Sequence, residues 1–301
     1  MIDFKPIALA DKAKVYELFK NNEYRSSGLS FANIFSWTSK HKTQLYIDLK
    51  EQIVLFRFID SNEKLCYTMP IGNMNLAHAL EMLLADAKEN NFLFRIAKVT
   101  DKMWQEINNA IPNTFRYIDC RDDYDYLYLT EKLITLPGKK LQSKRNHINR
   151  FKAENPDWKY IRITSDTEIN ECLEMLEEWE NNSFSRLHES QQFDYIATRT
   201  MLKNFHYFGL KGGAIKVNGK MIAFSFGEPL TKDTFVIHIE KAFEHITGAY
   251  AIINQQFALH EATSYTYINR EEDLGIENLR KAKMSYQPEI VLQHGIVLLN
   301  H

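Results

Sequence analysis

Short runs of apolar residues, separated by turn residues, dominate the first part of the chain. The runs 45–47, 53–59 and 65–67 have the length and composition of strands, and Asp60-Ser61-Asn62 forms a turn between the last two. These runs predict an antiparallel meander, and apolar positions at helical spacing predict helices around it. The other elements expected here are helices at 11–20, 76–87 and 101–110, the last capped by Asp101, and strands at 92–97, 115–118 and 126–129.

The second part of the chain repeats this order of elements. Asn218-Gly219 lies between two apolar runs and is a strong hairpin signal. The expected elements are helices at 139–153, 166–179, 193–205, 248–263 and 277–283, and strands at 160–163, 213–217, 221–228, 234–240, 265–268 and 290–298. Two parts of similar order predict a duplicated α+β architecture, with domains at 1–135 and 136–301.

Composition narrows the class of protein. The chain has 301 residues, of which 45% are hydrophobic and 25% charged, as in soluble globular proteins that form two domains. With 37 basic and 39 acidic residues the net charge is −2, which excludes a strongly basic nucleic-acid binder but leaves room for a local basic patch. The chain has neither a secretory signal at its start nor an apolar run of membrane-spanning length. We therefore expect a cytoplasmic protein without a transmembrane segment.

Several common chemistries have no motif in this sequence. Three cysteines at wide spacing, without a CxxC pair, indicate buried thiols in a reducing compartment. No HExxH, GxGxxG, GxxxxGK[ST] or GxSxG motif occurs, so we expect no metal site and disfavour redox, P-loop and serine-hydrolase functions. The acidic residues at 168–180 are interpreted as a solvated helix face.

The glycines are unevenly distributed. Only Gly28 and Gly72 of the 11 glycines precede residue 138. Glycine marks places where a backbone turns tightly or closely approaches a ligand, so the functional site is expected in the second part. Within that part, the junction 240–250 is the favoured place.

A basic helix is the first candidate binding element. The segment 139–152 carries cations and no acid, and Lys144, Arg145 and Lys152 fall on its apolar side while Arg150 lies opposite. Long basic side chains often reach past an apolar face to solvent, which gives a structural interpretation. The alternative is a cleft wall that receives a phosphate or another polyanion.

Two junctions between strands and helices are further candidates. A strand ending at Glu240 leads through Thr247, Gly248 and Ala249 into a helix, whose free backbone N–H groups would suit a phosphate. Such a junction is also an ordinary connection. The segment 268–286 combines an acidic turn with a basic helix end, where the cations either serve a site or complement the helix dipole.

The second part has the element order of a GNAT acyltransferase. The GNAT signature [Q/R]xxGx[G/A] falls on His245, Gly248 and Tyr250, and only the glycine matches. A closer resemblance covers nearly the whole chain, through Ser30–Trp37, Pro70-Ile71-Gly72 and the segments 136–151 and 269–286. These segments resemble the bacterial family related to the C-terminal domain of lysylphosphatidylglycerol synthases. The resemblance implies two tandem GNAT-like domains, similar to the Fem-type ligases that use charged tRNA. Because the first domain has only two glycines, we expect a donor site in the second domain alone.

This resemblance implies acyl transfer from an ester or thioester to an amine or hydroxyl, with no tightly bound cofactor. The expected donor is aminoacyl-tRNA; the alternatives are acyl-CoA and a non-catalytic anion-binding module. Small molecules, peptides and lipid headgroups are candidate acceptors, and the oligomeric state is not predicted. Glu240 and Asp273 are candidate general bases, while Lys283 or Tyr286 would stabilise the oxyanion or protonate the leaving group. Donor or phosphate contacts are expected from Lys144, Arg145, Arg150, Arg270, Arg280 and the backbone at Thr247, Gly248 and Ala249.

Overall fold

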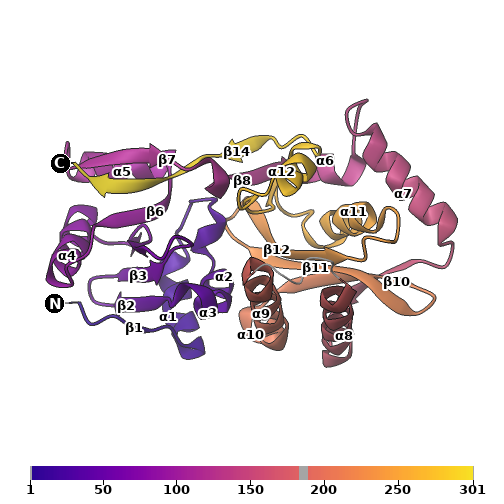
Figure 1. The fold of residues 1–301 in the computed structure, drawn as a ribbon, viewed down its shortest axis with the longest axis horizontal. Coiled ribbons are helices and arrows are strands. Elements are labelled where there is room, and N and C mark those ends of the chain that lie inside the picture. Colours follow the sequence, from indigo (N-terminus) through magenta and orange to yellow (C-terminus); the bar gives the residue numbers. More distant parts are fainter. Residues whose placement is uncertain (1, 183–188, 301) are drawn as a thin grey trace. The chain divides into compact units, whose positions relative to one another are not determined.

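The computed structural model describes residues 2–182 and 189–300. The chain divides into two compact units, one formed by Met1–Asp125 with Leu292–His301 and the other by Tyr126–Val291. Figure 1 shows the helices and strands of each unit. The expected division after residue 135 therefore differs from the observed one at both ends of the second unit.

An eight-stranded sheet forms the centre of the first unit, with strand order β1-β2-β3-β4-β6-β15-β7 and β5 paired to β3. The expected meander is confirmed, with antiparallel pairs between β2 and β3 and between β3 and β4. Strands β4 and β6 run parallel. The strand bounds are β1 Lys5–Pro6, β2 Gln44–Asp48, β3 Ile53–Ile59, β4 Leu65–Tyr67, β5 Ile71–Gly72, β6 Arg95–Thr100, β7 Phe115–Asp119 and β15 His294–Leu299.

The two longest helices of the first unit, Leu76–Glu89 and Asp101–Ala110, begin where a polar side chain caps them. Asn75 accepts from the N–H of His78, and the side chain of Thr100 accepts from the N–H of Met103. The predicted cap Asp101 is wrong by one residue, because the Thr100 hydroxyl occupies that role. The described helices are α1 Lys12–Phe19, α2 Phe31–Ser36, α3 Thr38–His41, α4 Leu76–Glu89 and α5 Asp101–Ala110.

A seven-stranded sheet forms the second unit, with strand order β14-β8-β13-β12-β11-β10-β9. The predicted hairpin at Asn218-Gly219 joins β10 and β11, and both turn residues have positive φ, 50° and 78°. Strands β12 and β13 run parallel, so their carboxyl ends meet at one edge. The strand bounds are β8 Asp125–Leu129, β9 Lys159–Ile163, β10 Lys211–Val217, β11 Lys220–Pro229, β12 Thr234–Ala242, β13 Tyr267–Asn269 and β14 Ile290–Leu292.

Helices cover both faces of this second sheet. Helix α11 is buried along most of its length and lies on one face, whereas α8 and α9 lie on the other (Figure 1). Helix α7, the predicted basic helix, runs beside α11. The described helices are α6 Thr130–Thr135, α7 Gln142–Glu154, α8 Asp166–Asn182, α9 Glu189–Lys203, α10 Phe205–Phe208, α11 Ala249–Glu261 and α12 Glu277–Met284.

The expected strand at 290–298 is two strands. Residues Ile290–Leu292 form β14 beside β8 in the second sheet, whereas His294–Leu299 form β15 between β6 and β7 in the first. One continuous apolar run therefore serves two sheets. Because β15 pairs within the first sheet, the last residues of the chain belong to the first unit.

Candidate active site

An ion pair between Glu240 and Arg270 lies at the carboxyl ends of two neighbouring parallel strands, β12 and β13. Arg270 Nη2 donates to Glu240 Oε1 at 2.9 Å, and both side chains are nearly enclosed, with 13% and 11% of their surface exposed. Asn254 of α11 donates from Nδ2 to the other carboxylate oxygen at 2.9 Å. Burial opposes the charge on Arg270, but Glu240 outweighs this effect and raises its pKa. Arg270 therefore stays charged, and Asn254 holds the Glu240 carboxylate by the oxygen that does not face Arg270.

Aromatic rings surround the Arg270 guanidinium. Its carbon lies 4.9 Å from the ring centre of Tyr286 and 5.6 Å from that of Tyr128, and these two rings meet edge to face. Lys144 of α7 places Nζ 4.2 Å from the centre of the Tyr286 ring. Four side chains thus form one cluster beside Glu240: Lys144 of α7, Tyr128 of β8, Arg270 after β13 and Tyr286 after α12.

Among the residues that the structure describes, three hydrogen-bond donors of this cluster have no protein acceptor. Arg270 Nη1 is buried without a partner in the described part of the chain, and so is one acceptor of the cluster, Asn254 Oδ1. Within the described part of the chain, neither the Lys144 ammonium nor the Tyr286 hydroxyl makes a hydrogen bond. A buried polar group without a partner is costly, and such groups mark places where a ligand supplies the missing hydrogen bonds.

The protonation states follow from burial and the neighbouring charges. Burial first, and then the positive charge of Arg270, lower the pKa of Lys144, although Glu240 acts in the opposite direction. Burial raises the pKa of Tyr286 to about 12, and Glu240 adds to this effect while Arg270 opposes it. The site thus combines a lysine whose pKa is lowered with a phenol whose pKa is raised.

The predicted phosphate turn before α11 is in contact with helix α7. Gly248 has a φ of 83°, and a Cβ on it would lie 2.4 Å from the carbonyl oxygen of His147. Only glycine accommodates both the left-handed backbone and this contact. The N–H of Ala249 donates to Ile246 O at 3.1 Å. The turn therefore supports α7, and with it Lys144; Thr247 lies half-buried in the same turn.

Two of the expected cations on α7 have partners outside the Glu240 cluster. Arg145 donates from Nη1 to the backbone carbonyls of Leu136 and Gly138, which ties the preceding loop to the helix. Arg150 pairs with Glu154 at 2.7 Å on the exposed face of the helix. Of the three α7 cations predicted as donor contacts, the structure thus places only Lys144 at this cluster.

The remaining predicted residues secure the loop after β13. The fully buried carboxylate of Asp273 accepts two hydrogen bonds from Arg280 at 2.7 and 2.8 Å, another from the Tyr126 hydroxyl, and one from a backbone N–H. Burial would raise its pKa, but these donors, Arg280 first, lower it to about 2. A carboxylate so weakly basic and so fully hydrogen-bonded is poorly suited to be the predicted general base.

Lys283 has a similar structural position. Its buried ammonium donates to the backbone carbonyl oxygens of Arg270, Glu271 and Glu272. These bonds direct its donors at the loop backbone, so Lys283 fixes the segment that carries Arg270.

Asn254 and Tyr128 also belong to the cluster around Glu240 and Arg270. The sequence does not predict them, because nothing in it distinguishes them from other helix and strand residues.

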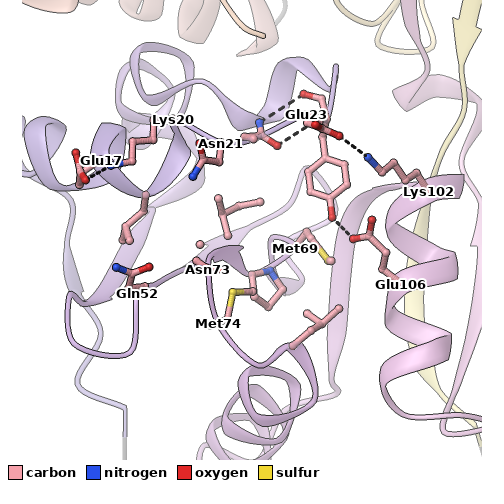
Figure 2. A pocket seen from close by; sticks show the side chains of 17 residues that line it. Glu17, Lys20, Asn21, Glu23, Gln52, Met69, Asn73, Met74, Lys102 and Glu106 are labelled. Atoms are coloured by element: carbon pink, nitrogen blue, oxygen red, sulfur yellow. Dashed lines mark hydrogen bonds and ion pairs between the residues drawn. The ribbon is translucent and has the colours of Figure 1, made fainter. Parts of the chain in front are cut away.

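The first unit contains a separate pocket, shown in Figure 2. Its cavity of about 620 Å³ is lined in part by the Pro70-Ile71-Gly72 motif. The charged side chains at its wall are largely paired with one another: Lys20 with Glu17, Lys102 with Glu23, and the Tyr24 hydroxyl with Glu106 (Figure 2). The pocket therefore shows no comparable set of uncommitted charged groups.

In residues 2–182 and 189–300, no group of three histidine, cysteine or acidic side chains is arranged to hold a metal ion. Across the same ranges, every helix is too short or too polar to cross a bilayer.

The family of the chain follows from its sequence over almost its full length. Residues 19–293 match the family described as phosphatidylglycerol lysyltransferase, C-terminal, and the chain belongs to this family. An uncharacterised protein of Mycoplasmoides gallisepticum is 24% identical over 177 residues, a match that covers 58% of this chain and 55% of that protein. The chain thus spans only about half the length of that curated relative.

Solved structures agree with this assignment. A conserved protein of unknown function from Bacteroides thetaiotaomicron is 41% identical over the full length of both chains, with a TM-score of 0.92. The L-PGS structure from Bacillus licheniformis has a TM-score of 0.67 at 16% identity, covering 100% of this chain and 94% of that one. At this identity the likeness shows the fold. The predicted α+β fold of two tandem GNAT-like domains is confirmed.

Proposed function

We propose that this chain is an aminoacyltransferase that moves an aminoacyl group from aminoacyl-tRNA to a hydroxyl or amine of a second substrate. The observation that supports this most strongly is the convergence of three uncommitted donors, Lys144, Arg270 and Tyr286, on one enclosed place. Acyl transfer passes through a tetrahedral oxyanion, and donors fixed in advance around it lower the barrier. Membership of the family and its acyltransferase-like fold support the same reaction class.

The proposed reaction balances without a co-reactant. The acceptor oxygen or nitrogen attacks the ester carbonyl carbon and passes its proton to the neutral amine of Lys144. Arg270 Nη1 and the Tyr286 hydroxyl donate to the oxyanion. When the intermediate collapses, the bond to the tRNA ribose oxygen breaks, and that oxygen takes the proton from Lys144. The products are the aminoacylated acceptor and free tRNA.

Lys144 replaces Glu240 as the base in this proposal. Both Glu240 oxygens already accept hydrogen bonds, from Arg270 and Asn254, so this carboxylate is best placed to fix the guanidinium. The lowered pKa of Lys144 increases its neutral fraction near neutral pH. The raised pKa of Tyr286 keeps its proton available for donation.

Helix α7 favours tRNA over acyl-CoA as the donor. In the GNAT resemblance, the turn at Gly248 would hold the pyrophosphate of coenzyme A, but the α7 backbone lies directly against this glycine. Exposed cations at and before α7, including Lys139, Lys140 and Lys152, offer contacts to a phosphate backbone instead. Lys139 and Lys140 also line a shallow pocket of about 250 Å³ at the start of this helix.

The test measures whether the chain removes the aminoacyl group from tRNA. The purified chain is incubated with tRNA carrying labelled amino acids, together with a small-molecule fraction of a bacterial extract, and loss of aminoacyl-tRNA is measured. We expect loss that depends on both the chain and the extract, and none with Lys144→Met. Lys220→Met is a matched control, because Lys220 lies on the exposed end of β11 and pairs with Glu178. Equal loss with and without the chain, or acetyl-CoA turnover instead, would reject the proposal.

A further inference from the structure

Strand β12 contains a β-bulge just before the candidate active site. Its pairing with β11 shifts by one residue after Phe226, which makes His238 the additional residue of the bulge. A Cβ on Gly227, opposite the bulge, would lie 1.8 Å from a carbonyl oxygen of β12, so this close approach needs glycine. Bulges redirect side chains and are frequent beside active sites.

The bulge directs the His238 ring between two carboxylates. Nδ1 lies 2.8 Å from Glu271 Oε1 and Nε2 lies 3.1 Å from Glu228 Oε1, and the His238 side chain has no exposed surface. An ionised carboxylate only accepts hydrogen bonds, so two of them require an N–H on each ring nitrogen. Burial alone would lower the pKa of His238, but its hydrogen bonds to Glu228 and Glu271 outweigh this and raise the pKa to about 9.

Glu271 is a strained residue that needs such support. Its φ is 58°, a left-handed conformation that is unfavourable for a residue with a side chain. Its N–H donates to Asn269 Oδ1 at 2.7 Å, and its carbonyl accepts from Lys283 Nζ at 3.0 Å. His238 holds the side chain of the same residue.

The next residue toward the N-terminus is Arg270, the centre of the candidate site. We infer that His238, held as an imidazolium between Glu228 and Glu271, is a positioning residue that keeps the turn in its strained form and so aims Arg270 at Glu240. This inference rests on the proposed function only for its catalytic consequence. Strain maintained beside a functional group is a known means of holding that group ready for reaction.

The charged groups near this ring come from several elements, and two of them, Glu228 and Glu271, contact it directly. Glu228 comes from β11, Glu271 from the loop after β13, and Lys283 of α12 touches the backbone of that loop. Arg270 and Glu240 form their own pair next to it. When His238 loses its proton, two carboxylates face a neutral ring that offers a single N–H, so one of the two hydrogen bonds is lost.

The test is an NMR experiment that needs no enzymatic activity. Histidine ring nitrogens and arginine side chains are labelled with nitrogen-15 in the full chain, and His238→Asn and Arg270→Lys assign the two signals. We expect the His238 ring to carry two N–H groups at pH 7.5 and to lose one near pH 9. In His238→Asn, guanidinium N–H exchange of Arg270 should be faster by about tenfold or more, because the turn opens more often.

Two further variants make the result decisive. Glu228→Gln removes one carboxylate and should move the His238 midpoint to lower pH, even if His238→Asn folds poorly. His206→Asn is the control, since His206 on α10 is half-exposed and lies 3.6 Å from Asp166, and it should leave Arg270 exchange unchanged. A neutral His238 ring at pH 7.5, or unchanged Arg270 exchange in a folded His238→Asn protein, would overturn the inference. Neither result depends on whether the chain transfers aminoacyl groups.

Discussion

Lys144 and Tyr286, far apart in the sequence, form one contact: the ammonium nitrogen lies 4.2 Å from the centre of the phenol ring. The contact places a lysine of lowered pKa next to Arg270. A cation on an aromatic face is ordinarily stabilised there, but burial and the neighbouring guanidinium favour the neutral amine. The Tyr286 ring therefore holds the Lys144 side chain in place, while burial and Arg270 lower its pKa. The proposed reaction requires both, because Lys144 must be positioned and must accept a proton as a neutral amine.

The pH dependence of transfer should report Lys144. Because the neutral amine is the active form, the rate should rise with pH and level off above the pKa of this lysine, which lies below its ordinary value of about 10.4. Lys144→Met should remove this rise and lower the rate by about 10²- to 10⁴-fold, the usual contribution of a general base. Single-turnover rates from pH 6 to 10 measure both effects. A Lys144→Met protein with the wild-type pH profile would contradict the assignment.

Arg270→Lys should lower the rate of transfer much more than it lowers the stability of the fold. Lysine keeps the positive charge beside Glu240 but lacks the rigid planar fork by which Arg270 donates to Glu240 through Nη2 and holds Nη1 free for a second acceptor. We expect a loss of rate of about 10²-fold or more, as for removal of one oxyanion donor, with a smaller effect on the melting temperature.

Glu240→Gln changes the other partner of the same ion pair and serves as the comparison for Arg270→Lys. It leaves the buried guanidinium without its anionic partner, which should cost about 3–5 kcal/mol of unfolding free energy. Urea unfolding of both variants checks the distinction. If Arg270→Lys proved as destabilising as Glu240→Gln while retaining full activity, the guanidinium would be structural only.

Gly248→Ala should loosen the contact between the turn and helix α7. The new methyl group would meet the His147 carbonyl oxygen, and alanine is also unfavourable at a φ of 83°. We expect a loss of about 1–3 kcal/mol and faster hydrogen exchange in residues 142–154. Gly219→Ala is the control, since Gly219 has a similar φ of 78° but open space around its Cβ position. Equal effects at both glycines would argue against a specific role of the α7 contact.

Asp273 should make the second unit sensitive to acid. Its pKa is lowered in the folded chain to about 2, against about 3.9 when unfolded. The stabilisation is therefore fully present above about pH 4 and is lost as the pH falls through 2. Asp273→Asn should abolish this part of the acid dependence, measured by thermal unfolding between pH 2 and 6. An unchanged acid dependence would show that other carboxylates determine it.

The centre of the second sheet could be predicted from apolar runs, because its strands β10, β11 and β12 are long and mostly buried. The hairpin at Asn218-Gly219 was also predictable, since only a few residue pairs fit two consecutive positive φ angles. The division of the last strand between two sheets was not. Its apolar run is continuous, and only the partners of β14 and β15, distant in sequence, reveal the break.

The candidate site was predicted in part. Glu240, Arg270, Tyr286 and Lys144 meet as a cluster, and Gly248 stands at the expected helix start. The roles of Asp273 and Lys283 depend on bonds made across the fold, which residue types alone do not reveal. The sequence indicates no role for His238, because a histidine within a strand has no distinguishing signal and the register shift that redirects it appears only in the paired sheet.

The most direct measurement follows the labelled amino acid from tRNA to product. The chain is mixed with tRNA carrying a carbon-14 aminoacyl group and with acceptor fractions, and the label is traced by chromatography and mass spectrometry. We predict that each aminoacyl group lost from tRNA appears on an acceptor through a new ester or amide bond, and that Lys144→Met and Arg270→Lys suppress this product. Label released only as free amino acid, or product formed equally by both variants, would contradict aminoacyl transfer at this site.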